Sequence, residues 1–80
     1  METFSIKMHG RAGMTYSEGE NSLEIDSEML NGRFDLVVYQ GSVTQWSGGS
    51  AALVSEDEKV RIIGNVRQFL ESKGLKVDWQ

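Results

Sequence analysis

The residues of this chain that could do chemistry are mostly carboxylates. Five acidic residues and no basic one lie between Ser17 and Gly32, namely Glu18, Glu20, Glu24, Asp26 and Glu28. Glu24, Asp26 and Glu28 are two residues apart, so in a strand they would project from one face, each about 7 Å from the next. The run lacks the spacing and turn glycine of a calcium-binding EF-hand loop. Two interpretations stay open: a patch that docks onto a basic surface, or a wet face kept charged against sheet-to-sheet aggregation.

Groups for catalysis or metal binding are scarce. His9 is the only histidine and there is no cysteine. Metal sites need three or four clustered ligands, and a catalytic triad needs a base with its orienting partner. We therefore expect His9 to be a solvent-exposed side chain. No Gly-x-Ser-x-Gly elbow occurs, and no lysine completes a phosphate-binding loop near the Ser47–Ser50 segment. The sequence predicts no enzyme activity, no metal and no cofactor.

Two aromatic residues form a second candidate group, because exposed aromatic side chains often anchor protein interfaces. Alternation in the segment 34–39 places Tyr39 on the same side as Val37, which we expect to face away from the helix. Trp46 follows after a turn and has two interpretations, as an interface anchor near Tyr39 or as a core residue. The candidate partner-binding residues are Glu24, Asp26, Glu28, Tyr39 and Trp46.

Alternating apolar and polar residues predict the strands that carry these side chains. The predicted strands are 4–9, 14–16, 23–28, 34–39, 43–46 and 75–80, with a short extended piece over 51–54. The segment 34–39 is apolar on both faces, as expected of a central strand. Asn31-Gly32, just before it, is a strong signal for a hairpin.

One helix is predicted over about 56–73, and its start is the clearest local signal. Ser55 can cap the helix, and Glu58 three residues later completes a capping box. An apolar stripe follows at helical spacing, made of Ile62, Ile63, Val66, Phe69 and Leu70. Gly74 is the expected residue just past the end. Gly64, inside the helix, lies outside the centre of this stripe and costs helix stability, about 1 kcal/mol relative to alanine.

These elements predict a single domain over 1–80 with an α+β fold in two layers. We expect a largely antiparallel meander sheet of five or six strands, with the helix at about 56–73 packed on one face. The 80 residues allow one modest core. The opposite sheet face is expected to stay largely open.

Composition narrows the class of partner. The net charge of −4, with basic residues scattered, disfavours nucleic acid and suits a basic protein partner. No stretch approaches the roughly 18 apolar residues of a membrane span, and the first nine residues lack the apolar core of a signal peptide. A domain of this size without cysteine also favours the cytoplasm, since small secreted domains usually carry disulfides.

Several segments together resemble the immunity protein 74 family of bacterial polymorphic-toxin systems. They are Tyr16-Ser17-Glu18-Gly19, Ile25-Asp26-Ser27-Glu28, Val37-Val38-Tyr39, Ser42-Val43-Thr44-Gln45-Trp46, Lys59, Ile62-Ile63, Asn65-Val66 and Gly74. The resemblance covers about 16–77, in short pieces. Family members often carry prolines soon after the tryptophan, where this chain has Ser47-Gly48-Gly49-Ser50. This departure leaves any role of that loop open.

The resemblance implies a cytoplasmic antitoxin that binds a cognate toxin domain and blocks it without catalysis. It assigns no functional residue, so the acidic strand and Tyr39 remain candidates on their own chemistry. A toxin that acts on nucleic acid often has a basic cleft, which an acidic surface would complement. The alternative is a non-catalytic structural or regulatory module, a homodimer joined through the open sheet face.

Overall fold

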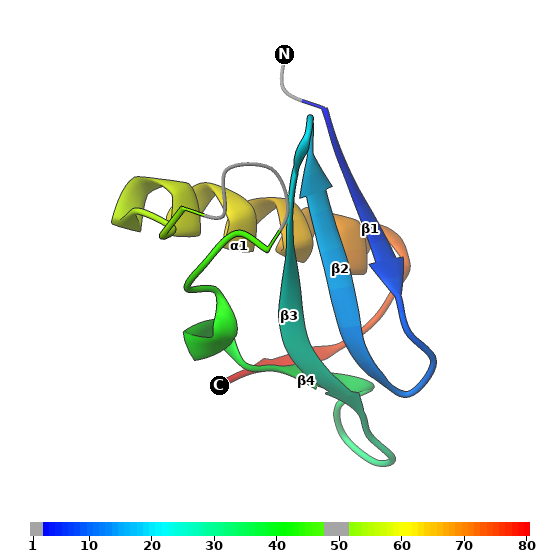
Figure 1. Ribbon diagram of the computed structural model, residues 1–80. Helices are drawn as coiled ribbons and strands as arrows, with labels where there is room; N and C mark the ends of the chain where they lie inside the picture. The colour runs from blue at the N-terminus through cyan, green and yellow to red at the C-terminus, as the bar shows by residue number, and fades with distance from the viewer. Residues whose placement is uncertain (1–2, 48–51) are drawn as a thin grey trace.

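The computed structural model describes residues 3–47 and 52–80. Within them, a five-stranded sheet forms one layer and a single α-helix forms the other (Figure 1). The sheet order is β1-β2-β3-β4-β5, with bounds β1 Phe4–Met8, β2 Ala12–Glu18, β3 Asn21–Met29, β4 Leu36–Val38 and β5 Val77–Trp79. The predicted α+β architecture is confirmed. No helix in the described residues has the length and hydrophobicity needed to cross a membrane.

The first three strands form an antiparallel meander. The β1–β2 turn contains Gly10 and the β2–β3 turn contains Gly19, at φ values of 62° and 60° that side chains rarely adopt. Along β3, Leu23, Ile25 and Ser27 are buried whereas the residues between them are exposed. The alternation predicted for this strand is therefore confirmed, and it fixes which side chains face solvent.

Strand β4 is shorter than the predicted segment 34–39, because Phe34 and Asp35 belong to the connection that joins it to β3. Six residues join β3 to β4, closed by the Leu30 N–H donating to the Asp35 carbonyl at 2.8 Å. Strands β3 and β4 pair antiparallel across this connection, so the hairpin predicted at Asn31-Gly32 is confirmed. All three residues of β4 are buried, as expected for a strand that is apolar on both faces.

The closing strand β5 lies parallel to β4, with Leu36 opposite Val77 and Val38 opposite Trp79. Parallel neighbours cannot be joined by a hairpin, so a crossover connection is required. Helix α1 (Glu56–Ser72) supplies this crossover. Strand β5 thereby completes the sheet on the far side of β4, although it is the last element in the chain.

The strand predicted over 43–46 is wrong. After β4 the chain enters the 3-10 helix η1 (Gln40–Ser42), which is tied to β3 because the Tyr39 N–H donates to the Asp26 carbonyl at 2.9 Å. The following residues form only an isolated bridge between Gln45 and Leu53. Val43 and Trp46 are instead buried in the core. Of the extended piece predicted over 51–54, Ala51 lies outside the described residues, as do 48–50 of the loop before it.

Helix α1 begins where the capping box predicted it. The Ser55 N–H donates to Glu58 Oε1 at 2.9 Å, and the Glu58 N–H donates to Ser55 Oγ at 3.2 Å. Both bonds satisfy backbone donors at the helix start. The helix buries Ile62, Ile63, Val66 and Leu70 against the sheet. It ends one residue before the predicted boundary, and Gly74 follows at φ +74° as expected of a residue just past a helix.

We expect Ser55→Ala to lower the free energy of unfolding by about 1 kcal/mol, because the helix start loses the side-chain acceptor of its cap. Urea denaturation followed by circular dichroism measures this. Ser5→Ala is the matched control, since Ser5 is exposed on β1 and should change stability little. Equal midpoints for the two variants would show that the capping box does not stabilise the fold.

Candidate partner-binding surface

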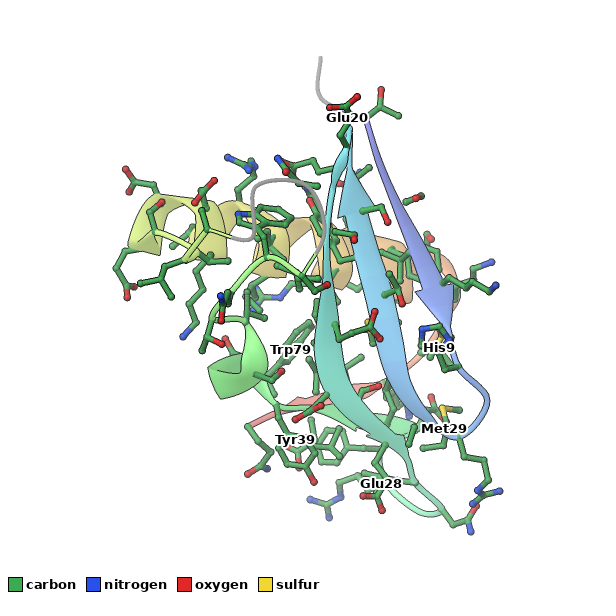
Figure 2. The ribbon with its side chains drawn as sticks, viewed as in Figure 1. His9, Glu20, Glu28, Met29, Tyr39 and Trp79 are labelled. Carbon is green, nitrogen blue, oxygen red and sulfur yellow. The ribbon has the colours of Figure 1, made fainter. Side chains whose placement is uncertain are left out.

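The sheet face away from helix α1 carries the acidic residues singled out from the sequence. Glu24, Asp26 and Glu28 all project from β3 into solvent, because the residues between them are buried against the helix side. Figure 2 looks onto this face, with the helix behind the strands and Glu28 and Tyr39 at its lower end. The predicted placement of the three carboxylates on one exposed face is confirmed.

Glu24 is the member of this row that has partners. The Thr15 hydroxyl, from the facing position on β2, donates to Glu24 Oε2 at 2.6 Å. His9 Nε2 lies 3.5 Å from Glu24 Oε1 and also contacts the Thr15 hydroxyl. His9 is exposed, as predicted. Because one ring nitrogen makes both contacts, the imidazole does not bridge a hydroxyl and a carboxylate as the histidine of a catalytic triad does.

Asp26 and Glu28 present free carboxylates. Neither side chain makes a hydrogen bond or ion pair with another described residue, although the Asp26 N–H donates to Ser42 Oγ at 2.9 Å. A carboxylate without an internal partner keeps its charge and its acceptors for a foreign surface. These two residues are therefore the part of the acidic row best able to meet a partner.

Strand β5 adds an acidic residue that the sequence patterns did not single out. Val37 lies in register between Glu28 of β3 and Asp78 of β5, so all three face the same side of the sheet. Val37 is only 4% exposed, while Asp78 accepts a hydrogen bond from Gln80 Nε2 at 2.8 Å. The acidic face thus spans three strands. Only the parallel pairing of β5 with β4, a long-range contact, brings Asp78 there.

The two aromatic candidates separate. Tyr39 is 41% exposed at the end of β4, as predicted for a residue on the open face. Trp46 is 3% exposed and its ring lies 6.4 Å from that of Tyr16 inside the core. The structure therefore favours the core interpretation of Trp46 over the interface one. Tyr39 and Trp46 do not form a common surface.

A polar network that the sequence patterns did not reveal joins the sheet to the helix. The Tyr16 hydroxyl donates to Glu18 Oε2 at 2.6 Å and accepts from Asn65 Nδ2 at 2.8 Å. Arg61 donates two hydrogen bonds to the same carboxylate, from Nε to Glu18 Oε2 at 3.1 Å and from Nη2 to Glu18 Oε1 at 2.6 Å. The signal in the sequence was weak: Tyr16 and Glu18 are two apart in a strand, and Arg61 and Asn65 are four apart in a helix.

The network shifts the ionisation of its members. Burial, together with the hydrogen bond to Glu18, raises the pKa of Tyr16 to about 12. Burial alone would raise the pKa of Glu18, but the hydrogen bonds from Arg61 and Tyr16 outweigh it and hold that pKa below its ordinary value. Tyr16 thus stays neutral and Glu18 stays charged near neutral pH. These shifts accompany the contacts that join the sheet to the helix.

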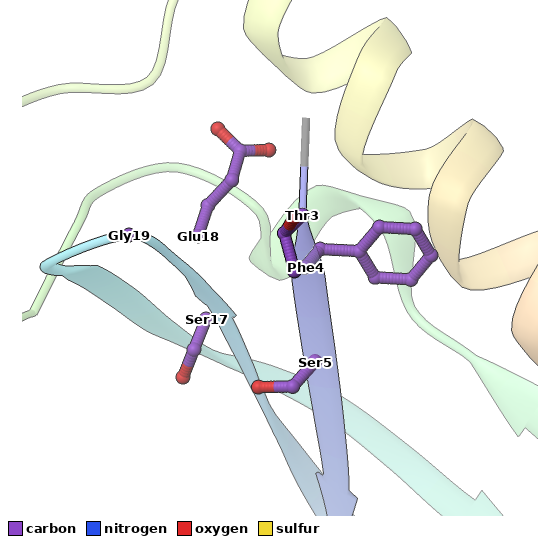
Figure 3. Close-up of a pocket in the computed structure, with 6 residues that line it drawn as sticks. All are labelled: Thr3, Phe4, Ser5, Ser17, Glu18 and Gly19. Atoms are coloured by element: carbon purple, nitrogen blue, oxygen red, sulfur yellow. The ribbon is translucent and has the colours of Figure 1, made fainter. Parts of the chain in front are cut away.

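A shallow pocket of about 580 Å³ lies where β1 begins and β2 ends, lined by Thr3, Phe4, Ser5, Ser17, Glu18 and Gly19. Figure 3 shows the Phe4 ring directed toward the helix and the two serine side chains on the other side of the strands. Glu18 is the only ionisable side chain in the lining, and both its oxygens are already engaged. The described residues also contain no cluster of ligands that could hold a metal ion.

The described residues thus form a two-layer α+β fold with one helix-covered sheet face and one exposed sheet face that carries the acidic row. A family model described as immunity protein 74 matches residues 6–80, nearly the whole chain. The protein belongs to the immunity protein 74 family. No curated protein and no solved structure matches it. Tyr16, Glu18 and Asn65 of the buried network all fall in segments that carried the resemblance in the sequence.

The lowered pKa of Glu18 predicts an acid-dependent loss of stability. Below its ordinary pKa of 4.5, the unfolded chain takes up a proton that the folded carboxylate resists, so stability is full above that pH and falls as the pH drops toward the folded value. Urea denaturation at a series of pH values should show a shallower fall for Glu18→Gln than for the wild type.

Glu20→Gln is the control for this experiment, because Glu20 is an exposed glutamate in the neighbouring turn. It should keep the wild-type dependence on pH. If the free energy of unfolding of Glu18→Gln and of the wild type fell equally steeply as the pH dropped below 4.5, the Glu18 network would not be the origin of the acid-dependent loss of stability.

Proposed function

We propose that this protein is an immunity protein that binds a cognate toxin domain and neutralises it by protein–protein docking, without catalysis. Membership of the immunity protein 74 family over residues 6–80 is the observation that carries the proposal. The docking surface is the open face of the sheet. The partner is a toxin with a basic surface, the complex forms in the cytoplasm of a bacterium, and neither nucleic acid nor a membrane takes part.

Charge supports this choice of surface. The chain has a net charge of −4, and three of its acidic residues stand in a row on β3 with Asp78 close by on the same face. Opposite charges steer two proteins together and accelerate their association. Among the described residues, the Asp26 and Glu28 side chains have no partner, so a basic residue of the toxin can pair with them without breaking any contact described above.

Tyr39 supplies an anchor beside these charges. Its side chain is 41% exposed, while its backbone is held in place by the hydrogen bond from the Tyr39 N–H to the Asp26 carbonyl. A tyrosine offers a rigid apolar ring and a polar tip, and such residues often contribute much of the binding energy of an interface. The docking surface therefore combines an aromatic anchor with flanking carboxylates. Trp46, buried in the core, has no part in it.

The proposal is tested by co-expression with the toxin domain encoded beside this gene. Cells that produce that toxin should resume growth when this protein is made, and the two proteins should elute as one complex. In a cell lysate, the activity of the toxin should fall as this protein is added and should reach its minimum at equimolar amounts. This is the result expected when one immunity protein blocks one toxin. If this protein restored growth against none of the neighbouring toxins, the proposed function would be refuted. If far less than one equivalent of this protein inactivated all of the toxin, each molecule would have acted more than once, which would instead indicate catalysis.

Neutralising two free carboxylates should slow the encounter with the toxin. We expect Asp26→Asn/Glu28→Gln to reduce the association rate constant by about tenfold at low ionic strength and by less at high salt, because screening weakens the steering. Stopped-flow or surface plasmon resonance measures this. Asp57→Asn/Glu71→Gln removes the same two charges from the helix side, where both residues are exposed, and should have a smaller effect. Equal effects would rule out the open face as the docking surface.

A further inference from the structure

The outer face of helix α1 has two features that the contacts within the chain do not explain. Val60 is 71% exposed. One turn later Gly64 stands in open space, since a side-chain carbon added there would have no atom within 4 Å. Glycine is the least favourable residue for a helix interior apart from proline, and here no close contact within the described residues requires it. An exposed apolar side chain and a missing one therefore lie next to each other on one face.

These residues line a groove. A recess of about 390 Å³ lies between α1 and Gln40 of η1, with Val60, Ile63 and Gly64 along its length. Glu56 stands at the end near the helix start, and Arg67 stands at the other end. In Figure 1 the first half of α1 projects beyond the strands, so this part of the helix is open to approach. The groove is on the helix layer and is separate from the acidic sheet face.

We propose that this groove is a dimer interface, occupied by the same helix of a second copy of the chain. The two helices lie antiparallel about a two-fold axis that passes between Val60 and Gly64. Each Val60 side chain then enters the recess above Gly64 of the partner subunit. A small residue at a helix contact lets the two backbones approach closely, so the exposed valine and the unfilled glycine position are the two halves of one contact.

The charges at the two ends of the groove fit this antiparallel arrangement. With Val60 opposite Gly64 of the partner subunit, each acidic Glu56 comes opposite a basic Arg67. The guanidinium of Arg67 already lies over the Trp79 ring, 5.1 Å from its centroid. Stacking uses the face of the guanidinium and leaves its in-plane N–H donors for a carboxylate. Arg67 is therefore held in position before the second copy arrives.

Self-complementarity identifies a second copy as the occupant. A two-fold interface requires one patch to match itself, with each feature meeting a different feature of the same patch. Here an apolar projection is matched by a recess, and an acid by a base, at four of the lining positions: Glu56, Val60, Gly64 and Arg67. Lys59 also lines the recess and adds a second basic residue beside Glu56. A parallel pair of helices would place Glu56 against Glu56 and would be repelled. One helix pair buries little surface, so we expect a weak dimer at the low end of interface sizes.

Sedimentation equilibrium from low micromolar to millimolar concentration tests the dimer. The wild type should change from monomer to dimer over this range. Glu56→Arg and Arg67→Glu should each weaken dimerisation by about tenfold, because two attractive pairs become repulsive. The double variant should recover to within about threefold of the wild type, since it inverts both pairs. A wild type that stays monomeric to millimolar concentration would overturn the proposal, as would a double variant no stronger than the single ones.

Gly64 provides a test in which loss of the dimer cannot be loss of the fold. Gly64→Gln should raise the urea midpoint of the monomer, because glutamine is a better helix former and has open space, and it should abolish the dimer by filling the recess. Gly64→Ala is the matched control, with the same backbone benefit and little bulk, and it should keep most of the dimer. A Gly64→Gln protein that still dimerised would place the interface elsewhere, as on the open sheet face, and would overturn the proposal.

Discussion

A single helix of 17 residues has to cover the apolar face of five strands, and a buried hydroxyl determines where it lies. Tyr16 is fully buried, so its hydroxyl must find partners inside the fold. It finds Glu18 on its own strand and Asn65 on the helix, and Arg61 then neutralises the carboxylate. Apolar contacts alone would tolerate sliding of the helix across the sheet. These directional bonds do not, because a shift would leave a charge and a hydroxyl unpaired.

With the helix fixed on one side, the opposite side of the sheet is left to solvent and its residues are mainly polar. The row on β3 is acidic, and β5 extends that character through Asp78. The outer surface of α1 is a second exposed region, with its own mixture of apolar and charged residues. The two surfaces lie on different layers, so a dimer formed through the helices leaves the open sheet face of each subunit free. The proposed dimer and the proposed complex with a toxin therefore use different surfaces.

Local signals in the sequence located the elements well, and long-range contacts explain the errors. The helix start was predictable because Ser55 and Glu58 contact each other three residues apart, and the β3 alternation showed which carboxylates would be exposed. The segment 43–46 has strand-forming residues, but η1 diverts the chain and the core takes up Val43 and Trp46. The position of Asp78 beside the acidic row could not be predicted, because its neighbours depend on the strand order. The Tyr16 network could not be predicted either, because its strand residues and its helix residues lie more than 40 positions apart in the chain.

The crossover from β4 through α1 to β5 determines the order in which the molecule can assemble. A ribosome releases the β1–β3 meander first, and its contacts are between neighbours in the chain, which form quickly. Strand β4 emerges soon afterwards and can pair only with β3. Its residues Leu36, Val37 and Val38, which are buried in the complete fold, stay uncovered until the helix and Val77–Trp79 have been synthesised. Until translation reaches Trp79, the nascent chain presents an uncovered apolar strand edge. The proposed docking surface, to which β5 contributes Asp78, is therefore complete only when this strand has been synthesised and has docked.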